Sequence, residues 1–195
     1  MLQTLATDPD AELMLRAQHN DSDSFGLLLD RNRGTVVHYL ARMVQNRAIA
    51  EELAQDVFVR VYRSRHSYTP SARFSTWLYR ITTNVALNYI RDRRRSVRDV
   101  SLNVQGSERL RHEAPDRAPL AEIRLIDDLR SRQVRRAIEA LPDKQRAAVI
   151  MHKYHELDYV QIGRAIGCTP AAVKALMFRA YETLRIRLRD LAARS

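Results

Sequence analysis

The sequence predicts an all-α protein made of two small helical domains that are joined by a flexible linker. Only 5 glycines occur in 195 residues, and no segment alternates apolar and polar residues for long enough to indicate a strand. The segment from Arg93 to Pro119 has no aromatic residue and collects Ser, Gly, Pro and mixed charge. Such a segment cannot bury enough apolar surface to offset its ordering entropy, so we expect a linker there. We place the domains at residues 10–95 and 123–195, with the linker at 96–122.

The charge balance indicates a polyanionic partner. The chain has 33 Lys and Arg against 23 Asp and Glu, a formal net charge of +10 and a pI near 10.3, and most of the excess is arginine, which suits phosphate. No stretch approaches the roughly 18 apolar residues of a membrane-spanning helix. The segment Met1 to Glu12 is acidic and lacks the apolar core of an export signal. We therefore expect a cytoplasmic protein without membrane insertion. The single Cys168 leaves no cysteine cluster for a structural zinc site.

In the first domain, Ser22 to Ser24 start a helix whose apolar residues recur at helical spacing up to Val44. A second helix runs from about Ala48 to Arg65. A solvated face is the ordinary explanation for its polar side, and a protein partner with a basic surface is the alternative in a chain this basic. That polar side carries Glu51, Glu52, Gln55 and Asp56.

The next segment predicts a polar loop and a third helix. Pro70 breaks the preceding helix, residues 71–73 form the loop, and Ser75 or Thr76 can cap the new helix. Its polar side becomes increasingly cationic towards Arg93 to Arg95, which favours contacts of arginines with phosphates and of amides with base edges. Aromatic residues near the loop belong either to the core or to a surface that stacks on an unpaired base. They are Tyr68, Phe74, Trp77 and Tyr79.

The second domain contains a predicted helix-turn-helix. A short helix from Tyr159 to Ile166 is closed by Gly167, and Thr169-Pro170 begins a longer helix up to Leu191. In such a unit the N-terminal half of the second helix enters the major groove, although an ordinary helical hairpin has the same pattern. The residues expected to meet DNA are Thr169, Ala171, Lys174, Ala175, Phe178 and Arg179.

Taken in order, AEELAQDVFVRVYR, FSTWLYRITTNVALNYIR, the arginine cluster, the linker and LPDKQRAAVIMHKYHELDYVQIGRAIGCTPAAVKALMFRAYETLR make the chain resemble an extracytoplasmic-function (ECF) sigma factor of bacterial RNA polymerase. The resemblance extends from about Ala11 to Leu191. It implies sigma region 2, which recognises and helps to melt the minus-ten promoter element, and sigma region 4, which recognises the minus-thirty-five element. It also implies that the linker passes through the active-site and RNA-exit channels of the polymerase.

By position, the resemblance implies that the helix with Glu51, Glu52, Gln55 and Asp56 binds the clamp coiled coil of core RNA polymerase. It implies that the loop captures a base flipped out of the melted strand. Flipping a base costs free energy, and stacking and edge contacts in the loop offset that free energy only for the correct base. The residues assigned to the minus-ten element are Tyr68, Ser71, Arg73, Asn84, Asn88, Arg91, Arg94 and Arg95.

In the second domain, Asp143 is expected to cap the helix that follows it. Many members of the family have a Ser-Arg pair where this chain has Ala175-Leu176. Loss of that arginine removes a phosphate contact and reduces the slope of log affinity against log salt concentration by about one unit. Binding of the minus-thirty-five element is then either weaker or depends on other cations. These are Lys174, Arg179, Arg185, Arg187 and Arg189.

The expected function is therefore promoter-specific initiation by core RNA polymerase, bound through its clamp coiled coil and its flap. Promoter DNA is a second partner, and the family implies an anti-sigma factor, often at the inner membrane. The alternative is a stand-alone helix-turn-helix regulator, which requires a ligand or phosphoacceptor site before the linker. No signature of an enzyme, a cofactor, a small-molecule substrate or a metal site is present: the 6 histidines are scattered, and residues 152–156 lack HExxH order.

Overall fold

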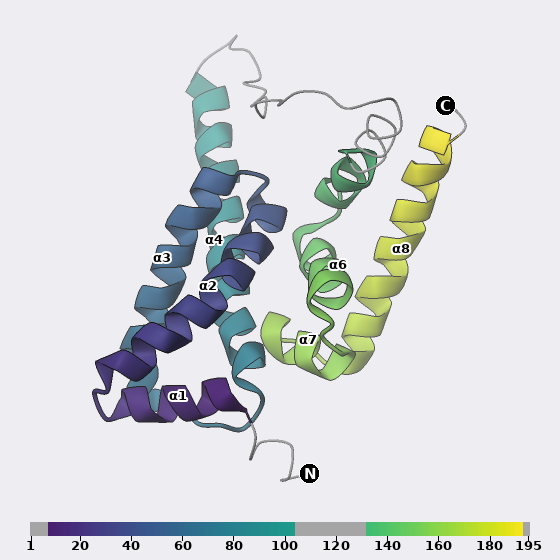
Figure 1. The fold of residues 1–195 in the computed structure, drawn as a ribbon. Coiled ribbons are helices and arrows are strands. Elements are labelled where there is room, and N and C mark those ends of the chain that lie inside the picture. Colours follow the sequence, from purple (N-terminus) through teal and green to yellow (C-terminus); the bar gives the residue numbers. More distant parts are fainter. Residues whose placement is uncertain (1–7, 104–131, 193–195) are drawn as a thin grey trace, which may run out of the picture.

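The computed structural model describes residues 8–103 and 132–192, and within these ranges all regular structure is helical. Figure 1 shows two groups of helices that lie side by side. Besides a helical stretch at residues 132–139, the elements are α1 (Pro9–Gln18), α2 (Ser22–Val44), α3 (Arg47–Arg63), the 3-10 turn η1 (Arg65–Ser67), α4 (Phe74–Asn103), α6 (Asp143–His155), α7 (Tyr159–Ile166) and α8 (Pro170–Ala192). The prediction of an all-α, two-domain fold is confirmed. Residues 104–122 of the predicted linker and residues 123–131 of the second predicted domain lie outside the described residues.

The first domain consists of α1 to α4, with α2 packed against the other three helices. Short polar side chains cap its first helices: Asp8 caps α1, Asp21 caps α2 and Asn46 caps α3. Our expectation that residues 22–24 start α2 places the helix correctly, but the capping side chain is Asp21, one residue earlier. The core contains fully buried side chains from all four helices, among them Met14, Leu28, Tyr39, Leu40, Met43, Val57 and Phe74.

The start of α4 differs from the sequence prediction. Neither Ser75 nor Thr76 caps the helix, because α4 already begins at Phe74. The Phe74 N–H donates to Asp8 Oδ2 at 2.7 Å, while Asp8 Oδ1 accepts from the N–H groups of Asp10 and Ala11. One carboxylate therefore serves the first turns of both α1 and α4, a partnership that no local sequence rule predicts.

The end of α4 also differs. The predicted boundary between the first domain and the linker, at residue 95, requires the helix to stop at the arginine cluster, but α4 continues to Asn103. The physical reason is that no glycine or proline occurs between Pro70 and Gly106, so nothing in this stretch interrupts the helix at Arg95.

The second domain contains the predicted helix-turn-helix, α7 and α8, packed on α6. Gly163 allows the tight turn, because a Cβ there would lie 2.6 Å from the carbonyl oxygen of Cys168. Gly167 ends α7 with a φ of +69°, which favours glycine. Thr169 Oγ1 accepts from the N–H of Ala172 at 3.2 Å and so caps α8, as predicted.

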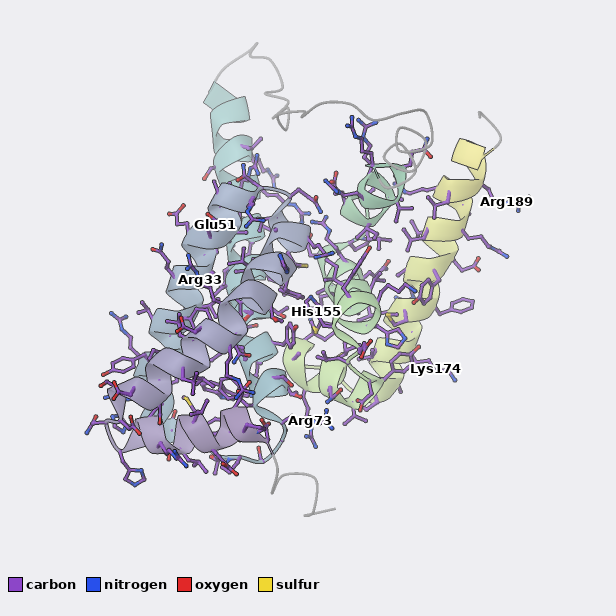
Figure 2. All side chains as sticks on the ribbon, viewed as in Figure 1. Arg33, Glu51, Arg73, His155, Lys174 and Arg189 are labelled. Carbon is purple, nitrogen blue, oxygen red and sulfur yellow. The ribbon has the colours of Figure 1, made fainter. Side chains whose placement is uncertain are left out.

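The two domains pack against each other, α7 on α4 and α6 on α2. His155 lies between them (Figure 2), with its ring 5.8 Å from the ring of Tyr39 and 5.1 Å from that of Tyr79. The guanidinium of Arg146 is buried and donates to the carbonyl oxygen of Met43 at 2.9 Å. Aromatic and polar contacts thus both contribute to this interface. Helix α8 lies on the outer side of the second domain (Figure 1).

Candidate nucleic-acid and protein interfaces

The predicted polar side of α3 faces solvent and is partly neutralised. Glu51, labelled on α3 in Figure 2, is exposed. It pairs with Arg47 at 3.1 Å, and Asp56 pairs with Arg60 at 2.9 Å. Glu52 is exposed and, among the described residues, takes part in no ion pair. The carboxylate of Glu52 is therefore the one on this surface that most needs an external cation, and exposed Gln55 lies one turn further along.

An apolar groove adjoins this surface and was missed by the sequence analysis. It has a volume of about 480 Å³ between α2 and α3. Within it, the rings of Phe25 and Tyr62 meet edge to face at 5.0 Å, and Val59 and Tyr62 are nearly half exposed. The sequence contained one signal for this groove: Val59 and Tyr62 are apolar, yet they lie outside the buried stripe of α3. The groove residues are Phe25, Leu29, Arg33, Glu51, Ala54, Gln55, Phe58, Val59, Tyr62 and Arg63.

The polar side of α4 has the predicted composition. Asn84 and Arg91 are exposed, and Asn88 is half-buried between them. Arg91 Nη2 donates to Asn88 Oδ1 at 2.8 Å. This hydrogen bond orients the two side chains, and it leaves the amide N–H₂ of Asn88 for a ligand. Nε of Arg91 lies 3.7 Å from Asp92 Oδ1, so Nη1 is the guanidinium nitrogen that points to neither partner.

The loop before α4 presents Ser71 and Arg73 to solvent, but it does not present Tyr68. The Tyr68 side chain is only 4% exposed, because its ring packs against Trp77 at 5.0 Å and Phe74 at 6.0 Å. Burial raises its pKa to about 12, with a further contribution from Asp8. Our expectation that Tyr68 contacts a base is therefore corrected: its ring supports the loop from beneath.

At the cationic part of α4, Arg94 is engaged by the second domain. Its Nη1 and Nη2 donate to the two carboxylate oxygens of Asp143 at 2.7 and 2.9 Å. Asp143 therefore does not cap α6, as we had expected. It is the first helical residue, and no side chain caps that end. Beside the pair, an open cleft of about 400 Å³ is lined by Leu87, Arg91, Arg94, Arg95, Arg98, Asp143 and Lys144.

The outward side of α8 has the predicted set of residues. Thr169, Ala171, Lys174, Ala175, Phe178 and Arg179 are all exposed, and the labelled Lys174 points away from the first domain (Figure 2). Further along the helix, Arg185 pairs with Glu182 at 3.1 Å, and Arg187 and Arg189 are exposed. The surface is thus cationic at intervals and apolar between them.

No described helix is long and apolar enough to cross a membrane. No three His, Cys, Asp or Glu side chains of residues 8–103 and 132–192 lie together in a way that would hold a metal ion.

Comparisons with known proteins divide the chain in the same way. The family described as Sigma-70 region 2 matches residues 28–96, and the family described as Sigma-70, region 4 matches residues 131–184. The chain is 31% identical over 178 residues to "ECF RNA polymerase sigma factor SigW" of Bacillus subtilis, which covers 90% of this chain and 95% of the relative. It is 30% identical over 190 residues to "ECF RNA polymerase sigma-E factor" of Escherichia coli, which covers 95% of this chain and 97% of the relative.

Solved structures agree with the fold. CnrH in complex with the cytosolic domain of CnrY is similar at a TM-score of 0.69 and 17% identity, over 94% of this chain and 99% of that chain. The sigma factor RpoE in complex with the anti-sigma factor NepR, from Bartonella quintana, is similar at a TM-score of 0.64 and 22% identity, over 85% of this chain and 96% of that chain.

Proposed function

The chain belongs to the ECF sigma factors of RNA polymerase, and from this membership we propose how its two domains share the recognition of a promoter. As a sigma factor it binds core RNA polymerase and directs promoter-specific transcription initiation. In our proposal residues 10–95 bind core enzyme and the minus-ten element, and residues 123–195 bind the minus-thirty-five element. Residues 96–122 connect the two domains and begin with the last turns of α4, which ends at Asn103.

We propose that core polymerase binds the solvent-facing side of α3 together with the adjoining groove. The unpaired carboxylate of Glu52 offers a contact for a basic helix of the clamp coiled coil, and Glu51, Gln55 and Asp56 surround it. The groove with Phe58 and Tyr62 offers apolar area next to that charge. A surface with an apolar centre and a charged border is typical of a specific protein interface.

We propose that the minus-ten element binds along α4 and the loop before it. Asn84 and Asn88 lie one turn apart and provide amides for base edges, while Arg91 provides a cation for phosphate. Ser71 and Arg73 are the exposed loop residues that we assign to a flipped base. Arg94 and Arg95 continue the phosphate contacts, Arg94 only after it leaves Asp143.

We propose that α8 binds the minus-thirty-five element with its outward side. A tethered domain gains effective concentration from its partner domain, so a recognition helix with only Lys174 and Arg179 as cations among its first ten residues suffices in the holoenzyme. The flap of core polymerase is the second protein contact that we assign to this domain.

We further propose a cytoplasmic protein that is regulated by an anti-sigma factor and catalyses no covalent step itself. Support for this partner comes from a similar structure, in which the sigma factor RpoE of Bartonella quintana is in complex with the anti-sigma factor NepR. The similar CnrH is likewise in complex with another protein, the cytosolic domain of CnrY. The covalent chemistry of transcription then belongs to the polymerase.

The observation that carries this proposal is that one small domain presents two chemically different surfaces, acidic and apolar on α3 and amide and cationic on α4. Size-exclusion chromatography with core RNA polymerase tests it, followed by transcription from promoters selected by the reconstituted holoenzyme. Co-elution with core and new promoter-specific transcripts are expected. Tight binding of a palindromic duplex without core, and no co-elution, would contradict it and favour a stand-alone regulator.

A further inference from the structure

The outward side of α8 is unusually poor in hydrogen-bonding groups for a surface that recognises bases. Between Thr169 and Arg179 the exposed residues are apolar except for Thr169, Lys174 and Arg179. The Thr169 hydroxyl already accepts from the N–H of Ala172. No Asn, Gln, Asp or Glu occurs in this stretch, so the side chains that pair with adenine edges or accept from cytosine are missing.

The apolar residues are placed where a base edge would lie. Ala171, Ala175 and Phe178 are spaced four and three apart, so they share one side of the helix. Phe178 is 69% exposed, while the opposite stripe of Val173, Met177 and Ala180 is buried and holds α8 on α6 and α7. Phe178 therefore has no packing role in the domain that would explain its ring.

The major groove offers one chemical partner for the apolar strip that Ala171, Ala175 and Phe178 form. The only apolar group that a base pair presents in the major groove is the C5-methyl of thymine, and Ala and Phe are side chains that contact it. The two alanines allow a close approach of the helix backbone, and the Phe178 ring extends the apolar surface at the end of the strip.

On the proposed function that α8 binds the minus-thirty-five element, we propose that Ala171, Ala175 and Phe178 select this element by packing against thymine methyl groups, with Lys174 and Arg179 on flanking phosphates. The strip is accessible as the structure stands, because α7 rather than α8 packs against α4. Specificity at these positions is then steric and apolar, and it requires no hydrogen bond to a base.

The experiment removes the methyl group without changing the base pairing. Holoenzyme reconstituted from the full chain and core RNA polymerase selects duplexes from a library randomised in the upstream region. The selected duplex is then synthesised with deoxyuridine in place of thymidine, one position at a time on either strand, and the holoenzyme affinity for each is measured. We expect one or two positions where uracil weakens binding about three- to fivefold, the value for one buried methyl group.

Variants then assign the effect to the strip. The holoenzyme with Phe178→Ala should lose most of the preference for thymine over uracil, and Phe178→Leu should retain part of it. Ile186→Ala is the matched control, since Ile186 is an apolar residue of the same helix that is 59% exposed and lies outside the strip. It should keep the wild-type preference.

The possible outcomes distinguish a failure of methyl recognition from a failure of the proposed minus-thirty-five function. An upstream element without A·T pairs, equal binding of thymine and uracil duplexes, or an unchanged preference in Phe178→Ala would each overturn methyl recognition and leave the role of α8 in DNA binding intact. Recovery of no shared upstream sequence from the library would instead overturn the proposed minus-thirty-five function of this domain.

Discussion

Arg94 of α4 and Asp143 of α6 form a two-point ion pair between the two domains, with N–O distances of 2.7 and 2.9 Å. Arg94 is also one of the cations that we assign to promoter phosphates. A phosphate and the Asp143 carboxylate offer the same kind of acceptor, so they compete for one guanidinium. DNA binding by α4 and docking of the second domain are therefore opposed at this residue.

Replacing Asp143 with Asn should loosen the contact between the domains. The Arg94 side chain is 63% exposed and that of Asp143 is 22% exposed, so we expect a loss of about 0.5–1 kcal/mol, or about two- to fivefold in the docking equilibrium. Small-angle scattering should detect a larger radius of gyration. Asp92→Asn is the matched control, because Asp92 pairs with Arg91 on the same helix. An equal change in both variants would contradict a role of the Arg94–Asp143 ion pair in docking.

Docking should also weaken as the pH falls. Burial, together with smaller contributions from Arg42 and His38 of α2, lowers the pKa of His155 from 6.5 to about 4. The separated state then binds more protons between these values, so docking is strongest above about pH 6.5 and is lost as the pH falls towards 4. Scattering at about pH 7 and about pH 5 measures this. His155→Phe keeps the aromatic ring without the titration, and a pH response that persists in this variant would exclude His155 as its origin.

Charge reversal at Glu52 should weaken core binding. Since Glu52 has no cation beside it among the described residues, Glu52→Lys creates repulsion without freeing an arginine. We expect a roughly tenfold increase in the Kd for core polymerase, with a steeper dependence on salt. Glu12→Lys is the control, because it makes the same change at an exposed position of α1. Unchanged affinity in Glu52→Lys would place the clamp contact elsewhere.

Replacement of Asn84 and Asn88 with Ala should impair promoter melting. Amide contacts to base edges contribute about 1–3 kcal/mol each, so open-complex formation should fall at least about tenfold. Permanganate footprinting measures the melted strand, and core affinity measured in parallel serves as the control. If both quantities fell equally, the two side chains would be structural.

Gly163→Ala should destabilise the second domain. The new Cβ would meet the carbonyl oxygen of Cys168 at 2.6 Å, and overpacking of this kind costs about 1–3 kcal/mol. Gly34→Ala is the matched control, since a Cβ at Gly34 meets nothing within 4 Å and the exchange within α2 should stabilise by up to about 1 kcal/mol. Urea unfolding should show opposite shifts of the midpoint, and equal midpoints would contradict the close contact.

The sequence predicted the elements whose determinants are local. The helix-turn-helix was predicted because Gly167, Thr169 and Pro170 are signals that act within one turn of chain. Likewise the amide and cationic side of α4 follows from helical spacing alone. The residues of α3 that face solvent were predicted in the same way.

The errors occurred where distant parts of the chain meet. Tyr68 was assigned to DNA because a loop aromatic gives no sign of the two rings that bury it. Asp143 was assigned to a cap because its partner Arg94 lies in the other domain. The apolar groove depends on residues from two helices, so neither helix pattern indicates it by itself.

The Asp8 carboxylate accepts hydrogen bonds from the first turns of both α1 and α4, and this has a consequence for promoter choice. The carboxylate fixes the first turn of α4 from 66 residues away, and the loop with Ser71 and Arg73 leads directly into that turn. The conformation of the loop that we assign to a flipped base thus depends on Asp8, at the N-terminal edge of the domain. Deletion or fusion at this edge would alter which promoters are melted, although no residue that touches DNA has been changed.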